Sequence, residues 1–155
     1  MEAYARATAQ ALADPDPWIG FAGYIEKLCA MQAADRGFAD ILTVSFPCAE
    51  AMETRRTEAF HGFLELIGRA NDSGHLREDF TSRDLVLLLM ANAGVLSATG
   101  DAAPDTSRRL VAWMVQSFQA PTRGPLPDPP DDAALYEAMR RASHSVNSSE
   151  TGKRH

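Results

Sequence analysis

Hydrophobic positions are densest between Leu85 and Leu96, where the sequence reads "LVLLLMANAGVL". Just before this run, Thr81 is followed three residues later by Asp84, a variant of the capping box that starts helices. The pattern predicts a helix over about residues 82–98. Because its apolar residues fall on nearly every side, this helix needs cover on nearly every side.

Apolar residues at spacings of three and four predict the other elements. Asp16 can cap a helix and Pro17 suits its first position, so a helix begins near Trp18. Gly74 is a natural stop for the helix before it, and Leu76 can fold back over that helix end. Further helices are expected over residues 2–13, 38–45, 49–71, 105–119 and 131–142. No strand-like alternation occurs, so the predicted fold class is all-α, a bundle of six to seven helices.

The chain divides into four expected segments. Residues 1–13 form a short leading helix, and residues 14–120 form the main domain. Residues 121–142 hold a proline-rich linker, "PTRGPLPDPPDD", and a short amphipathic helix, followed by a loose tail at 143–155.

Charge and composition narrow the possible partners. Fifteen basic residues stand against 21 acidic ones, for a net charge of −6, which disfavours direct nucleic-acid binding by this chain. Cys29 and Cys48 lie in apolar patterns and suit a reducing, cytoplasmic compartment. We expect no signal peptide, no membrane span, no metal site and no cofactor.

The sequence offers little support for an enzyme. It has no nucleophile elbow, phosphate loop or zinc-protease motif. Cys48 and His61 are thirteen residues apart, roughly 20 Å along one helix at ~1.5 Å per residue, too far to act as a pair. The chain is therefore expected not to be an enzyme.

The helices expected at 82–98 and 105–119 carry broad apolar stripes. These stripes need a partner surface that buries them. If each protomer contributes two such helices, a homodimer closes a four-helix bundle and buries both stripes.

Several segments, taken in order, resemble a known family. They are "CAMQAADRGFADIL", "GHLREDFTSRDL", "ANAGV", "ATGDAAPDTSRRL" and "PLPDPP". The series, from about Ala11 to Ala142, resembles the C-terminal regulatory domain of TetR-family transcriptional regulators, most closely the SbtR-like subset. Members of that family begin with a DNA-binding domain containing a helix-turn-helix, and this sequence shows no counterpart. Residues 1–13 resemble the end of the connecting helix. A cloned fragment, a truncated gene and a start codon assigned too late all remain open explanations.

The resemblance implies a small, mostly apolar effector of unknown identity, bound inside each protomer, and dimerisation through the last two long helices. The expected ligand-binding residues are Phe21, Ile25, Leu28, Phe38, Leu42, Phe60, His61, Phe63, Leu64, Leu89 and Asn92. The expected dimer interface is Leu85, Leu88, Val111, Met114, Val115 and Phe118. Effector binding would shift the population of the helix at 2–13. Mixed dimers with a full-length relative are a further expectation.

Alternatives stay open for two polar candidates and for the whole chain. Asn92 could bind an effector, pair with its counterpart across the dimer, or bond to nearby backbone. His61 could titrate near neutral pH at the effector site, or be a partly exposed helix residue. The competing function is a helical dimerisation module that binds no ligand and has a filled core.

Overall fold

The computed structural model describes residues 2–35 and 54–151. This part of the chain contains six helices: α1 (Glu2–Ala13), α2 (Pro17–Asp35), α4 (Thr54–Asp72), α5 (Ser82–Thr99), α6 (Thr106–Phe118) and α7 (Asp132–Thr151). Its only pairing of β type is an isolated bridge between Leu76 and Gln119. The all-α class is confirmed. The helix expected at 38–45 lies outside the described residues.

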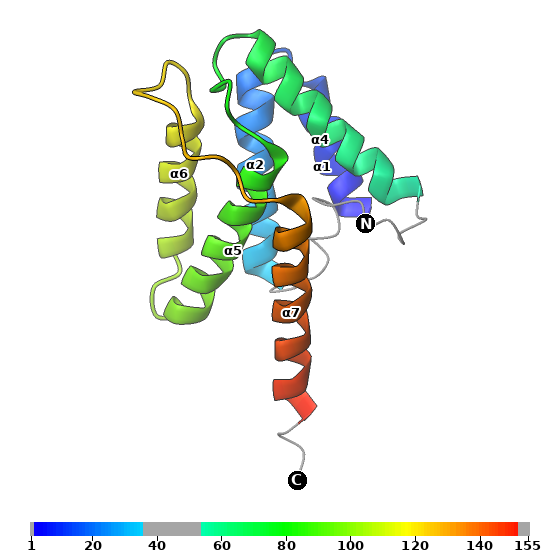
Figure 1. The fold of residues 1–155 in the computed structure, drawn as a ribbon, viewed down its shortest axis with the longest axis vertical. Coiled ribbons are helices and arrows are strands. Elements are labelled where there is room, and N and C mark those ends of the chain that lie inside the picture. Colours follow the sequence, from blue (N-terminus) through cyan, green and yellow to red (C-terminus); the bar gives the residue numbers. More distant parts are fainter. Residues whose placement is uncertain (1, 36–53, 152–155) are drawn as a thin grey trace.

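Helix α2 occupies the centre of the bundle and packs against α1, α4, α5 and α6 (Figure 1). Helices α1 and α4 lie together on one side of it, and α5 and α6 lie on the other. Helix α7 runs beside α5 and extends beyond the rest of the molecule (Figure 1). The arrangement leaves α5 between α6 and α7.

A chain of aromatic rings ties the bundle together at one end. Phe21 of α2 meets Phe80 edge to face, with ring centroids 5.2 Å apart. Phe80 meets Phe118 of α6 in the same way at 4.9 Å. Edge-to-face contacts of this kind add to the stabilisation from burial. Phe80, which lies between α4 and α5, therefore joins α2 to α6.

The segment between α4 and α5 forms the turn that the sequence predicts. Gly74 adopts a positive φ of 79°, which glycine tolerates best, and its N–H donates to the Asn71 carbonyl. Leu76 folds back over the end of α4, donates to the Ala70 carbonyl and is buried. Helix α5 then begins after Thr81, whose backbone N–H donates to the Asp84 carboxylate at 2.7 Å.

Arg77 clamps this turn to the segment that follows α6. Its buried guanidinium pairs with Asp79 and donates to the carbonyls of Ser117 and Gly124. Asp79 also accepts from the Leu126 N–H. The Arg77 hydrogen bond and then the Leu126 hydrogen bond lower the pKa of Asp79 to about 2, so its carboxylate stays charged. The motif "GHLREDF" thus has a structural role.

Helix α7 is longer than the sequence analysis expects. It continues to Thr151, nine residues past Ala142. Neither glycine nor proline interrupts the chain between Pro130 and Gly152, so nothing in the local sequence stops the helix. Its first turns are anchored where Leu135 and Met139 pack with Val86 and Met90 of α5.

Candidate functional site

Most of the apolar residues expected to bind an effector lie in the interior between α2, α4 and α5. Phe21, Ile25, Leu28, Phe63 and Leu89 are at most 1% exposed. Phe38 and Leu42 lie outside the described residues. The interior is therefore aromatic and aliphatic, the composition that apolar ligands prefer.

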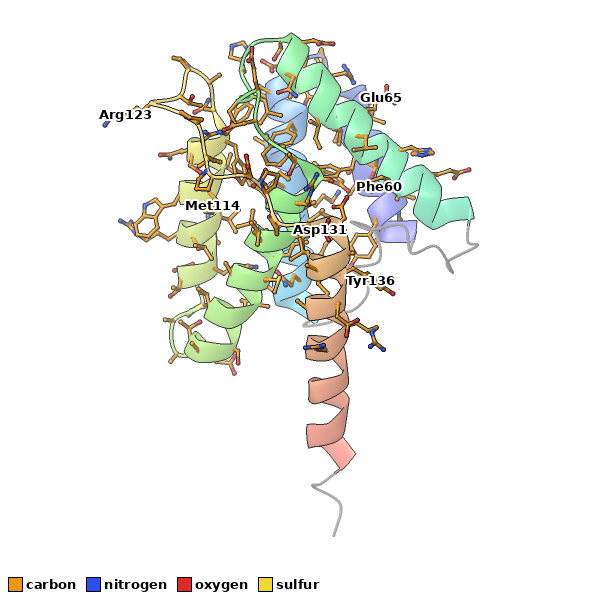
Figure 2. The ribbon with its side chains drawn as sticks, in the orientation of Figure 1. Phe60, Glu65, Met114, Arg123, Asp131 and Tyr136 are labelled. Carbon is orange, nitrogen blue, oxygen red and sulfur yellow. The ribbon has the colours of Figure 1, made fainter. Side chains whose placement is uncertain are left out.

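The three remaining candidates on α4 differ in exposure. Phe60 is half-buried on the side of α4 turned to the rest of the molecule, whereas Glu65 points outward (Figure 2). His61 is exposed, and Leu64 is 43% exposed. On a helix successive residues lie about 100° apart, so only one side of α4 can line the interior. His61 and Leu64 are thus on the outer surface in this structure.

Tyr24 places a polar hydroxyl in this apolar interior. Its ring stacks on Phe63 with centroids 5.5 Å apart, and it is 2% exposed. Its buried hydroxyl has no hydrogen-bond partner among the described residues, and the nearby Thr8 hydroxyl donates to the Tyr4 carbonyl. Burial raises the pKa of Tyr24, and the adjacent Thr8 side chain partly offsets the rise, although no hydrogen bond joins the two hydroxyls. The phenol is therefore neutral and available to a polar group.

Asn92 has partners that the sequence analysis did not consider. Its amide nitrogen donates to Gln32 Oε1 at 2.8 Å, and its amide oxygen accepts from the Ser107 hydroxyl at 2.5 Å. Gln32 in turn donates to the Leu89 carbonyl at 2.9 Å. Asn92 thus joins α2, α5 and α6 inside one protomer. It needs neither an effector nor a second copy to satisfy its amide.

The expected interface residues are mostly part of the protomer core. Leu85, Leu88, Val111, Val115 and Phe118 are between 0% and 7% exposed, and Met114 alone is half-buried. The physical reason is that α5 and α6 pack on α2, which uses the most apolar side of each helix. Those five residues have little surface left for a partner.

A different apolar face remains exposed on α5 and α6. It consists of Leu87, Ala91, Gly94 and Ala98 on α5, with Leu110, Trp113 and Met114 on α6. We call it the α5–α6 face. Trp113 is 61% exposed and Leu87 42% exposed. The α5 members recur at spacings of four, three and four, so they lie on one side of the helix. Helix α5 is therefore not covered on every side within the protomer.

A groove runs along the other side of α6, where it meets α2. Its volume is about 880 Å³, and its lining includes Cys29, Ala30, Val111 and Ala112. Burial, with a smaller contribution from Glu26, raises the pKa of the Cys29 thiol to about 12, so this cysteine is inert. Arg109, on the rim, lies over the Trp113 ring at 5.1 Å.

Helix α1 is held at close crossings with both of its neighbours. A Cβ built on Gly20 of α2 would lie 2.5 Å from the Ala11 carbonyl oxygen. A Cβ built on Gly62 of α4 would lie 2.4 Å from Thr8 Cγ2. Arg69 of α4 donates to the carbonyls of Leu12 and Asp14 at the end of α1. The position of α1 is thus tied to the positions of α2 and α4.

Comparison with known proteins decides the family. The profile of the family described as "Transcriptional regulator SbtR-like, C-terminal domain", a TetR-type regulatory domain, matches residues 16–117. The chain belongs to this family. No curated protein matches the chain.

The region matched by the SbtR-like profile runs from just before α2 to the end of α6. It therefore contains the interior around Tyr24, the hydrogen-bonded Gln32–Asn92–Ser107 set and the α5–α6 face. No helix among the described residues is long and apolar enough to span a membrane. The same residues contain no cluster of His, Cys, Asp and Glu that could bind a metal.

Sequence reasoning missed several residues of this SbtR-like domain. The sequence analysis does not predict the buried hydrogen bonds of Gln32 and Ser107 or the buried hydroxyl of Tyr24. The sequence shows that Leu87 and Trp113 are apolar, but it does not show that they lie on the exposed α5–α6 face. A signal was present, because a helix apolar all round must expose one side when its neighbours cover only the others.

Proposed function

We propose that this chain is the effector-binding and dimerisation domain of a TetR-family transcriptional regulator. The observation that carries the proposal is the α5–α6 face, which leaves Leu87 and Trp113 largely exposed on helices whose other sides are buried. An exposed apolar patch on neighbouring helices is typical of a protein interface. Family membership supports the same role.

The α5–α6 face suits a second copy of the chain. A symmetric dimer places the same patch of each subunit against its counterpart. Two helices from each protomer then form a four-helix bundle, the arrangement that hides such a face in many all-α proteins. Ala91, Gly94 and Ala98 have small side chains, so a partner helix can approach α5 closely. In this proposal the interface comprises Leu87, Leu110, Trp113 and Met114 in place of the buried residues first expected.

Effector binding is the second part of the proposal. The support is an interior of aliphatic and aromatic groups in which, among the described residues, the buried Tyr24 hydroxyl has no hydrogen-bond partner. Ligand sites commonly combine apolar walls with a few polar groups that orient the ligand. Because α1 is tied to α2 and α4, an effector that favours one arrangement of these helices would also shift the population of α1 positions. The effector is expected to be small and mostly apolar.

One observation favours the alternative, a helical dimerisation module without a ligand. The exposed fraction is 0% for Phe21, Ile25, Leu28 and Leu89, so the described core is closed to solvent. This alternative predicts that small apolar compounds leave the unfolding temperature unchanged. The effector-binding domain predicts that at least one compound class raises it, by linkage to binding.

Two matched substitutions test the dimer. Leu87 on α5 and Leu64 on α4 are 42% and 43% exposed, so replacing either with arginine costs little within the protomer. We expect Leu87→Arg to weaken self-association by at least 10-fold, since it places a charge at the centre of the interface. Leu64→Arg should leave it unchanged. Sedimentation equilibrium at micromolar concentration measures both, and equal association of the two variants would overturn this interface.

A further inference from the structure

The three buried polar residues Gln32, Asn92 and Ser107, here called the polar triad, come from three different helices. They are 2%, 0% and 6% exposed. Hydrogen bonds run in one direction, from Ser107 to Asn92, from Asn92 to Gln32, and from Gln32 to the Leu89 carbonyl. Leu28, Leu88 and Val111, each one helical turn from a triad residue, are buried apolar residues.

The triad admits only one rotational setting of α6 against α2 and α5. A polar group buried without a partner is costly, so settings that separate the three side chains are disfavoured. Apolar contacts between helices tolerate small rotations, whereas hydrogen bonds require particular directions. The buried triad therefore favours the arrangement of α2, α5 and α6 in which its three hydrogen bonds form.

That arrangement determines which residues of α6 reach the surface. Ser107 is buried, whereas Leu110 and Met114, one and two turns further along α6, are half-buried. Rotating α6 by one residue, about 100°, would change which of its residues lie on the α5–α6 face. On α5, Asn92 directly follows Ala91, a member of the α5–α6 face. The triad thus fixes the shape of a surface that its own buried atoms do not reach.

Gln32 adds α2 to this arrangement. The same helix carries Phe21, Ile25 and Leu28 in the interior, and its only buried amide bonds both to Asn92 and to the α5 backbone. A displacement of α2 must either break these bonds or carry α5 and α6 with it.

We propose that the polar triad couples the position of α2 to the strength of dimerisation, by holding α5 and α6 in the setting that presents the α5–α6 face. The proposal rests on the proposed dimer. It makes Gln32, Asn92 and Ser107 positioning residues, because they are buried within the protomer. Coupling between sites in proteins commonly amounts to about 5- to 150-fold in affinity.

The first test compares two Ser→Ala changes. Ser107→Ala removes the hydroxyl that bonds Asn92, and Ser73→Ala removes one that bonds the Ala70 carbonyl at the end of α4. Ser73→Ala also removes a contact with His75 Nδ1 at 3.3 Å, so the control loses at least as many hydrogen bonds, but only Ser107 belongs to the triad. Sedimentation should show the dimer weakened at least 5-fold by Ser107→Ala and less than 2-fold by Ser73→Ala. Equal effects would overturn the coupling.

A second variant separates positioning from simple stability. In Gln32→Met, Asn92→Leu and Ser107→Ala combined, no triad group remains to be left unpaired, so the protomer should unfold near the wild-type temperature. We expect its dimer to stay at least 5-fold weaker, because nothing now selects the setting of α6. Wild-type dimer affinity in this variant would refute the inference while leaving the dimer proposal intact. A wild-type protein that stays monomeric at high micromolar concentration refutes both.

Discussion

At the scale of single residues, polar groups inside the bundle carry most of the specific information. Arg77 and Asn92 are both buried and hydrogen-bonded. Arg77 forms an ion pair with Asp79, and Asn92 belongs to the polar triad. Tyr24 differs from both, because its buried hydroxyl has no partner. Buried polar atoms are rarely left unpaired in folded proteins, so each exception calls for a role.

Replacing Tyr24 with phenylalanine tests whether its hydroxyl is unpaired in the ligand-free protein. The change keeps the ring stacked on Phe63 and removes only the buried oxygen. We expect the free energy of unfolding to rise by about 1 kcal/mol, the lower end of the cost of burying an unpaired polar group. Chemical denaturation measures the change. A less stable variant would show that the hydroxyl has a partner in solution.

At the scale of elements, close crossings decide how the helices fit. Two glycines of α2 illustrate this. Gly20 faces the Ala11 carbonyl of α1 so closely that no side chain fits, whereas Gly23 has open space within 4 Å of its built Cβ. Both look alike in the sequence, as helix-weakening residues three positions apart. The difference arises because only one of them faces α1.

The two glycines therefore predict opposite effects of the same substitution. Gly23→Ala should stabilise the protein by roughly 0.5–1 kcal/mol, through higher helix propensity without new contacts. Gly20→Ala should destabilise it, because the added Cβ meets backbone that cannot move aside cheaply. Thermal unfolding of the two variants, side by side, measures the contrast. A stable Gly20→Ala protein would mean that α1 lies further from α2 than the structure places it.

At the scale of the whole molecule, the protomer leaves one apolar face uncovered. Helices α5 and α6 use their most apolar sides against α2, and α7 covers only the side of α5 around Val86. What stays exposed runs across α5 and α6, with Trp113 at its edge. In our proposal the second copy completes the cover, so the dimer is the unit whose stability is measured.

If dimerisation stabilises the fold, the unfolding temperature must depend on protein concentration. We expect it to rise over the range from about 1 to 100 μM for the wild-type chain, as mass action favours the dimer. The Leu87→Arg variant should show a much smaller rise over the same range. Differential scanning fluorimetry provides the measurement, and a wild-type temperature independent of concentration would contradict a stability-linked dimer.

The sequence by itself determined the helices and the family. Helical spacing and the capping signals at Asp16, Thr81 and Gly74 act within a few residues, so they can be read locally, and the segments that resemble the SbtR-like domain occur in order. The sequence analysis expects a loose tail from residue 143 because that stretch is polar, whereas α7 continues to Thr151. Polar composition alone does not end a helix.

Only the tertiary structure decided which side of each helix faces which neighbour. Gln32 and Asn92 are 60 residues apart, and Gln32 and Leu89 are 57 apart. Nothing local marks such pairs. The same limit explains why Leu85 and Leu88 were expected at the interface and are in the core, while Leu87 is exposed. A helix that is apolar on several sides is predicted to be buried on most of them. The packing of α2, α6 and α7 around α5 decides which side stays exposed.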